Sequence, residues 1–307
     1  MAEGVAERLL RGDPRALARA LTLVESDAKA AAPILHAVHK ALGRAHRVGI
    51  TGPPGVGKST LVGALAGAWR RQERKVGVLA VDPTSPFSGG ALLGDRIRLG
   101  AHHGDSGVFI RSLASRGASG GLSLAVHDAA DLLEAAGYDP VVIETVGVGQ
   151  AEIDIARAAD TTVLVLAPGG GDEIQAMKAG LLEAADLIVV NQADRRDVDR
   201  MVQGLEAGLQ LRAKEAPRIL KTIATKGEGV DAVRDAIDQR LQADDGEVEA
   251  RRRARARMRI REVVDRSRAA RYWETHHGEL ESLAAEVIQG TISVAGAAAR
   301  LRREGEA

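Results

Sequence analysis

The spacing of hydrophobic residues along the chain changes near position 45. Before it, apolar side chains recur at helical spacing after the cap-like pair Asp13 and Pro14, and Gly43 ends a second amphipathic stripe at 34–42. Beyond it, apolar residues form short runs without alternation, which is typical of strands buried on both faces of a parallel sheet. These runs lie at 76–81, 108–110, 141–143, 161–167, 187–190 and 219–223.

Helical stretches separate most of these runs, which gives the chain the rhythm of repeated β-α-β units. We therefore predict an α/β fold over residues 47–238, with a doubly wound, mostly parallel sheet. Residues 1–46 are predicted to form a helical N-terminal extension. Residues 239–307 are predicted to form a helical C-terminal extension, which we expect to mediate dimerisation.

Residues 52–59 form a complete G-x-x-x-x-G-K-S/T element between a β-prone run and a helical stretch. In such a P-loop the backbone N–H groups surround a polyphosphate at a helix N-terminus. We expect Lys58 to reach the β- and γ-phosphates and Ser59 to bind Mg²⁺. The predicted nucleotide contacts of this element are Gly52, Pro53, Pro54, Gly55, Val56, Gly57, Lys58, Ser59 and Thr60.

Acidic residues follow the predicted strands, where doubly wound sheets bind their ligands. Asp82 ends one run, Glu144 ends another, and Asp95 lies in a predicted loop. Mg²⁺ prefers oxygen ligands, so these three carboxylates join Ser59 as candidate metal ligands. A turn-forming role for Asp82 and an ordinary loop position for Asp95 are the alternatives.

Glu144 also begins the segment Glu-Thr-Val-Gly, which ends at Gly147. It is a variant of the D-x-x-G element by which GTPases sense a γ-phosphate through the glycine N–H, so Gly147 is a predicted nucleotide contact. Lys58 is the predicted catalytic cation. Asp95 and Glu144 are the candidates for orienting the attacking water.

A base-reading element closes the run at 187–190. Asn191 and Asp194 fit the guanine-reading N-K-x-D motif, in which the Asp carboxylate accepts hydrogen bonds from guanine N1–H and the exocyclic amine. Gln192 replaces the lysine of that motif, and we expect the replacement to weaken nucleotide affinity more than guanine preference. Ala224 and Thr225, after the last run, fit the backbone donor to the guanine oxygen.

Composition narrows the classes of function. The 307 residues carry 42 basic and 42 acidic side chains, so no overall charge attracts nucleic acid or a membrane. The absence of cysteine excludes disulfides and thiolate metal sites. Without a signal-peptide pattern at the start or a long apolar run, we expect a cytoplasmic protein.

An arginine-rich stretch at 251–261 suggests RNA or an acidic membrane as a ligand. However, Glu247 and Arg251 form an i, i+4 pair, and Ile260, Val263 and Val264 give the stretch an apolar side. These features favour a solvated or dimer-contacting helix, and we expect neither nucleic acid nor membrane as a partner.

Five segments together resemble one family. GPPGVGKST, LAVDPTSPFSGGALLGDRIRL, IETVGVGQAE, APGGGDEIQAMKAGL and NQAD are similar to the GTPase chaperones of cobalamin-dependent acyl-CoA mutases, the methylmalonyl-CoA mutase-associated or MeaB type, once also labelled ArgK. The likeness covers roughly residues 45–230. It implies a homodimeric, Mg²⁺-dependent GTPase that binds GTP and GDP, with a cobalamin-dependent acyl-CoA mutase and an adenosyltransferase as partners.

The resemblance also implies roles for particular residues. Lys58 and Ser59 would bind phosphate and Mg²⁺, and Asp82, Asp95 and Glu144 would be switch and metal-site residues. A partner-sensing third switch would lie at 169–178. Two other classes stay open: a metallochaperone GTPase that delivers nickel or cobalt, and a P-loop kinase acting on a small molecule.

Overall fold

The computed structural model describes residues 2–82, 104–114, 124–145, 151–169, 180–210, 216–243 and 246–304. The chain divides into two compact units, Met1–Arg252 and Arg253–Ala307. The first contains the sheet and its flanking helices, and the second is helical. The predicted domain bounds at 46 and 238 stay a prediction.

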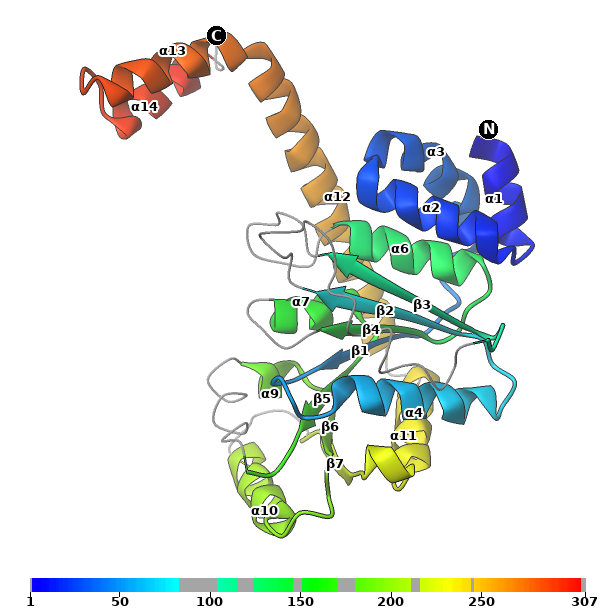
Figure 1. Cartoon of the computed structure of the whole chain (residues 1–307). Helices are drawn as coiled ribbons and strands as arrows, with labels where there is room; N and C mark the ends of the chain where they lie inside the picture. The colour runs from blue at the N-terminus through cyan, green and yellow to red at the C-terminus, as the bar shows by residue number, and fades with distance from the viewer. Residues whose placement is uncertain are drawn as a thin grey trace. The chain divides into compact units, whose positions relative to one another are not determined.

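Seven parallel strands form a single sheet in the first unit (Figure 1). They are β1 Arg47–Thr51, β2 Val76–Asp82, β3 Val108–Ala114, β4 Val141–Thr145, β5 Thr161–Leu166, β6 Leu187–Val190 and β7 Arg218–Lys221. Their order is β3-β2-β4-β1-β5-β6-β7, and every pair is parallel. The predicted doubly wound α/β fold is confirmed.

The strand order reverses beside β1, because the chain adds β2, β3 and β4 on one side of it and β5, β6 and β7 on the other. In open parallel sheets ligands bind beyond the carboxyl ends of the strands at such a point. The register places Ile50 of β1 next to Glu144 of β4, and Glu144 next to Ala80 of β2. Glu144 is therefore central at this edge.

Both faces of the sheet are covered by helices (Figure 1). Val78 and Val142 pack in a cluster with α4 Lys58–Arg70 and α11 Val230–Gln242. Their neighbours Leu79 and Val141 point the other way, into a cluster with α6 Leu124–Ala135 and α7 Ala151–Ala158. Helices α9 Leu181–Ala184 and α10 Val198–Leu209 pack on β5 and β6. Burial on both faces explains the runs without alternation.

The two edge strands, β3 and β7, depart from that expectation, and the run at 108–110 in β3 is only half buried. The run at 219–223 predicted a strand buried on both faces, but β7 is only half buried, with Arg218 and Lys221 exposed. The reason is its position, because β7 is the last strand of the sheet and has one strand neighbour, β6. The spacing of apolar residues along the sequence does not by itself distinguish an edge strand from a central one.

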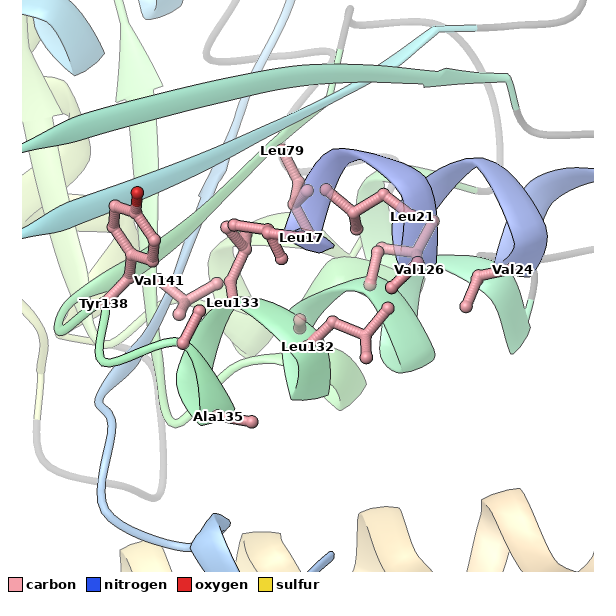
Figure 2. Close-up of a cluster of buried hydrophobic side chains, with 14 of the residues drawn as sticks. Leu17, Leu21, Val24, Leu79, Val126, Leu132, Leu133, Ala135, Tyr138 and Val141 are labelled. Atoms are coloured by element: carbon pink, nitrogen blue, oxygen red, sulfur yellow. The ribbon is translucent and has the colours of Figure 1, made fainter. Parts of the chain in front are cut away.

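The N-terminal extension consists of α1 Ala2–Leu10, α2 Pro14–Ser26, α3 Ala28–Val38 and the short 3-10 helix η1 His39–Ala41. Asp13 caps α2 as predicted, since its carboxylate accepts the N–H groups of Arg15 and Ala16 at 2.8 and 3.3 Å. Leu17 and Leu21 pack beside Leu132 of α6 in one buried cluster (Figure 2). The extension therefore shares the core of the first unit.

A buried ion-pair cluster lies at the amino edge of the sheet, opposite the carboxyl ends. Arg47, the first residue of β1, pairs with Asp131 and Glu134 of α6. Burial opposes the charged form of Arg47, but these two carboxylates outweigh it and raise its pKa above the usual value. The cluster fixes the start of β1 against α6.

Helix α12, Glu247–Thr275, begins in the first unit. Arg251 donates to Asp186 at 2.7 Å and to Glu247 at 2.9 Å, which confirms the predicted i, i+4 pair. Arg252 pairs with Asp160 at 3.0 Å. Because Asp160 and Asp186 precede β5 and β6, these contacts tie the first turns of α12 to the amino edge of the sheet.

The second unit contains the rest of α12 together with α13 His277–Ile288 and α14 Val294–Glu304. Leu283, Ala297 and Leu301 form its small core, and the Tyr272 hydroxyl donates to the Leu301 carbonyl oxygen at 2.6 Å. Ile260 and Val263 are 64% and 50% exposed. No helix in the described ranges is long and apolar enough to cross a membrane.

Candidate functional site

The glycine-rich loop joins β1 to α4 at the carboxyl edge of the sheet. Gly52, Gly55 and Gly57 have φ values of 142°, 81° and 91°, which L side chains rarely adopt. Gly57 is the N-cap of α4, a helix of 13 residues. The loop therefore precedes a helix N-terminus, where N–H groups and the helix dipole favour an anion.

Gly52 has no room for a side chain. A Cβ atom at this position would lie 2.1 Å from the backbone oxygen of Val165 in β5, whereas a Cβ at Gly55 would meet open space. The close approach of the loop to β5 therefore depends on glycine at position 52.

We expect Gly52→Ala to lower the free energy of unfolding by at least about 3 kcal/mol, because the loop or β5 must move. Gly55→Ala is the matched control and should cost about 1 kcal/mol, from its positive φ alone. Urea denaturation of both variants and wild type measures the difference. Equal losses would contradict a steric role for Gly52.

Lys58, the first residue of α4, is buried and folds back onto the loop. Its Nζ donates to the carbonyl oxygens of Gly52 at 2.7 Å and Pro53 at 2.8 Å. The ammonium is thus held within the P-loop, with its aliphatic stem among protein atoms. A cation fixed in this position can neutralise charge on a phosphate that the loop binds.

Ser59 and Glu144 meet beside the loop. The Ser59 hydroxyl donates to Glu144 Oε1 at 2.6 Å, and both residues are buried, at 7% and 3% exposed. A hydroxyl and a carboxylate in contact are hard oxygen donors of the kind that Mg²⁺ takes alongside phosphates and waters. The residues present therefore fit this cation. In the described part of the chain no three His, Cys, Asp or Glu side chains gather as a metal-binding group.

The other predicted ligands are placed only in part. Asp82 ends β2, where its backbone pairs with Ala114, and the preceding Val81 is in register with Thr145 of β4. The Asp82 side chain lies outside the described residues, as do Asp95 and Gly147. Of the predicted third switch at 169–178, only Gly169 is described.

Asn191 connects the base-reading loop to the P-loop. Its Nδ2 donates to the Val56 carbonyl oxygen at 2.9 Å, and its Oδ1 accepts from the Thr222 hydroxyl and the Ala224 N–H, both at 3.1 Å. The side chain is buried at 3% exposed. Asn191 thus holds three loops at the carboxyl edge in one arrangement.

Asp194 lies at the surface, whereas Asn191 is buried. Its side chain is 50% exposed, and its Oδ2 lies 3.7 Å from Nζ of Lys226. Ala224 and Thr225 belong with Lys226 to the short 3-10 helix η3 Ala224–Lys226. The carboxylate that would read guanine and the segment that would supply the backbone donor therefore lie close together.

Two contacts at this edge escaped prediction. Gln192 Nε2 donates to the Gly55 carbonyl oxygen at 3.2 Å, so the residue in the lysine position still reaches the P-loop. Lys226 pairs with Asp194. The lysine usual at position 192 ties to the phosphate loop, and the structure shows that Gln192 keeps a contact with that loop. Lys226 directly follows Ala224 and Thr225, which the sequence did predict as site residues, so its position was the available signal.

Known proteins resemble this chain over most of its length. A family model described as methylmalonyl Co-A mutase-associated GTPase MeaB matches residues 17–277. A Pyrococcus horikoshii protein named as a GTPase is 48% identical over 266 residues, covering 84% of this chain and 84% of that protein. The mitochondrial methylmalonic aciduria type A homolog of Mus musculus is 33% identical over 313 residues, covering 93% and 75% respectively.

A solved structure extends the likeness to the fold. The crystal structure of LAO/AO transport system kinase is similar with a TM-score of 0.73 and 28% identity, and the match covers 100% of this chain and 98% of that chain. The resemblance found in the sequence is confirmed, because the family model spans well over half of the chain. The chain therefore belongs to the MeaB family, the methylmalonyl-CoA mutase-associated GTPases, and is a P-loop GTPase that binds guanine nucleotides.

Proposed function

We propose that this GTPase is Mg²⁺-dependent and acts as a chaperone that protects a cobalamin-dependent acyl-CoA mutase and gates its cofactor loading. The observation that carries the proposal is the family match over residues 17–277, whose description names methylmalonyl-CoA mutase. That match includes the P-loop, the Ser59 and Glu144 pair and the base-reading loop.

Catalysis of phosphoryl transfer in this site would depend on positioning of the reacting groups and on electrostatic stabilisation of the transition state. The loop amides at the start of α4 cradle the polyphosphate, and the Lys58 ammonium neutralises charge that develops on the phosphoryl oxygens. Glu144 and Asp95 are the candidates for orienting the attacking water. Support for Glu144 comes from its burial and from its place between β1 and β2 at the carboxyl edge.

Ser59 and Glu144 would hold the Mg²⁺, with Asp82 and Asp95 as further candidate ligands. When bound, the cation neutralises charge on the β- and γ-phosphate oxygens. The 2.6 Å contact between the Ser59 hydroxyl and Glu144 supports this assignment, because it brings two oxygen donors together next to the phosphate loop.

Asp194 would read guanine N1–H and the exocyclic amine, while Ala224 or Thr225 would donate a backbone N–H to the guanine oxygen. Asn191 would support nucleotide binding by holding together the loops that it joins. Gly147 would contact the γ-phosphate. The half-exposed carboxylate of Asp194 beside η3 supports this arrangement.

The proposed partners are the mutase, an adenosyltransferase that supplies its cofactor, and a second copy of this chain in a homodimer. We propose that the protein meets these partners in the cytoplasm. The exposed Ile260 and Val263 of α12 support the C-terminal extension as the dimer contact.

The test measures GTP turnover with and without purified cobalamin-dependent acyl-CoA mutase from the same organism. We expect the mutase to change turnover by about five- to a hundredfold, since coupling between sites commonly falls in that range. Lys58→Ala, which is expected to lack hydrolysis, corrects for turnover by contaminants. A mutase that neither binds nor alters turnover would contradict the proposal and favour the metallochaperone alternative.

A kinase is the second candidate, because the similar solved structure is named as a transport system kinase. A kinase passes the γ-phosphoryl group to a small molecule, whereas a GTPase passes it to water. Labelled γ-phosphate from GTP separates the two. We expect all of the label as inorganic phosphate, and label on an added small molecule would favour the kinase.

A further inference from the structure

Arg195 connects the base-reading loop to the turn that follows β5. Its Nη1 donates to the Pro168 carbonyl oxygen at 2.8 Å, although the two residues are 27 positions apart along the chain. A Cβ atom at Gly169 would lie 3.6 Å from the same Nη1, so the guanidinium lies against both residues of this turn. The base-reading loop and the turn are therefore in direct contact through the Arg195 side chain.

Backbone hydrogen bonds hold Arg195 in place. Its N–H donates to the Gln192 carbonyl oxygen at 3.1 Å, and its own carbonyl oxygen accepts the Val198 N–H at 3.3 Å. Arg195 also directly follows Asp194, the carboxylate that would read guanine. A change in the position of Asp194 is therefore transmitted to Arg195 through the backbone that they share.

The turn after β5 lies between a fixed strand and a glycine run. Val165 of β5 packs so closely on the P-loop that a Cβ atom at Gly52 would lie 2.1 Å from its backbone oxygen. Gly169 is the first of three successive glycines, a sequence that changes backbone conformation at little steric cost. The Pro168 carbonyl group that Arg195 holds is therefore placed where a fixed part of the chain meets a sequence suited to rearrangement.

The contact between Arg195 and Pro168 is of a kind that a ligand can strengthen. Asp194 and Arg195 are both exposed, so little buried surface opposes local opening of their loop. A base bound to Asp194 would reduce that opening, and the charge-assisted bond from Arg195 would then break less often. A ligand shifts such an equilibrium only by binding one arrangement better, and a guanine contact with Asp194 supplies that difference.

On the guanine-binding role proposed above, we propose that Arg195 is a positioning residue that couples occupation of the base site to the turn after β5. Bound guanine fixes Asp194, and the adjacent guanidinium then holds the Pro168 carbonyl group and the start of the glycine run in one arrangement. Loss of the base releases the turn. Because Gly169 is exposed, a partner protein at this edge of the sheet can distinguish the two arrangements.

The experiment measures amide hydrogen exchange by mass spectrometry in the peptide that contains Ala167 and Gly169, with and without saturating GDP. In the wild-type protein GDP should slow this exchange by about three- to tenfold, because a charge-assisted hydrogen bond opens less often. Arg195→Met keeps an unbranched stem and removes the donors, so GDP should change its exchange by less than about twofold. Arg195→Lys keeps a charged donor on a shorter side chain and should retain part of the GDP effect.

Arg196 provides a matched control, since it is an exposed arginine at the next position of the same loop. Arg196→Met removes the same charge but should keep the GDP effect within about twofold of wild type. Calorimetric titration establishes the GDP concentration that saturates each variant. A peptide from α2 is the internal reference, because general destabilisation would speed exchange there as well.

The outcomes distinguish this inference from the function on which it rests. An equal GDP effect in wild type and Arg195→Met would overturn the role of Arg195, and so would an equal loss in Arg195→Met and Arg196→Met. A wild-type protein that prefers GDP to ADP but shows no GDP effect in this peptide would overturn it as well. Equal binding of GDP and ADP by the wild-type protein would overturn the guanine site itself.

Discussion

Lys58→Ala is expected to reduce GTP hydrolysis by at least about 100-fold, the typical loss when one preorganised group that stabilises the transition state is removed. The reason is the placement of the ammonium, which the carbonyl oxygens of Gly52 and Pro53 hold inside the P-loop at 2.7 and 2.8 Å. No other cation is fixed within this loop among the residues that the structure describes. Turnover of radiolabelled GTP measures the effect.

Lys58→Met is the matched variant, because it keeps the buried stem and removes only the charge. Both variants should retain the circular dichroism spectrum of wild type, since Lys58 lies in the first turn of α4 and contributes little to the sheet core. Retained hydrolysis in Lys58→Met would remove the ammonium from the mechanism. If Lys58→Ala alone loses the wild-type circular dichroism spectrum, its loss of hydrolysis would be due to disrupted packing.

Asp194→Asn is expected to weaken GDP binding by about 100-fold, because two charge-assisted hydrogen bonds to guanine are lost and an amide N–H₂ faces the guanine donors. The wild-type protein should bind GDP at least about tenfold more tightly than ADP, or about 1.4 kcal/mol. Calorimetric titration with both nucleotides measures these affinities. The half-exposed Asp194 makes the substitution compatible with folding.

The control for Asp194→Asn is a changed base. Xanthine carries a carbonyl oxygen where guanine has its exocyclic amine, so it offers an acceptor to the new amide. Xanthosine diphosphate should therefore bind the variant better than GDP does, and the wild-type protein worse. If Asp194→Asn binds GDP as wild type does, Asp194 does not read the base.

Features that depend on neighbouring residues could be predicted from the sequence. The apolar runs predicted strands because burial on both faces of a parallel sheet removes alternation, and the structure has a strand at each of the six runs. The glycine spacing predicted a P-loop because positive φ values suit glycine, and Gly52, Gly55 and Gly57 all have them. Asp13 predicted a helix cap for the same kind of local reason.

The sequence also predicted that the site residues lie at one edge of the sheet, because the motifs that contain them lie at the carboxyl ends of parallel strands. It could not say which side chains meet there. Its main structural error was to expect burial on both faces for β3 and β7, which are edge strands. Edge position depends on which strands pair rather than on the composition of any one of them.

Contacts between distant segments were decided by the tertiary structure alone. Ser59 meets Glu144 across 85 positions, Asn191 meets Val56 across 135, and Gln192 meets Gly55 across 137. Sequence motifs name such residues one at a time, because hydrogen-bonding distance between them depends on strand order and register. Only the folded sheet, with β4 and β5 beside β1 and β6 beyond β5, brings these side chains within reach of the P-loop.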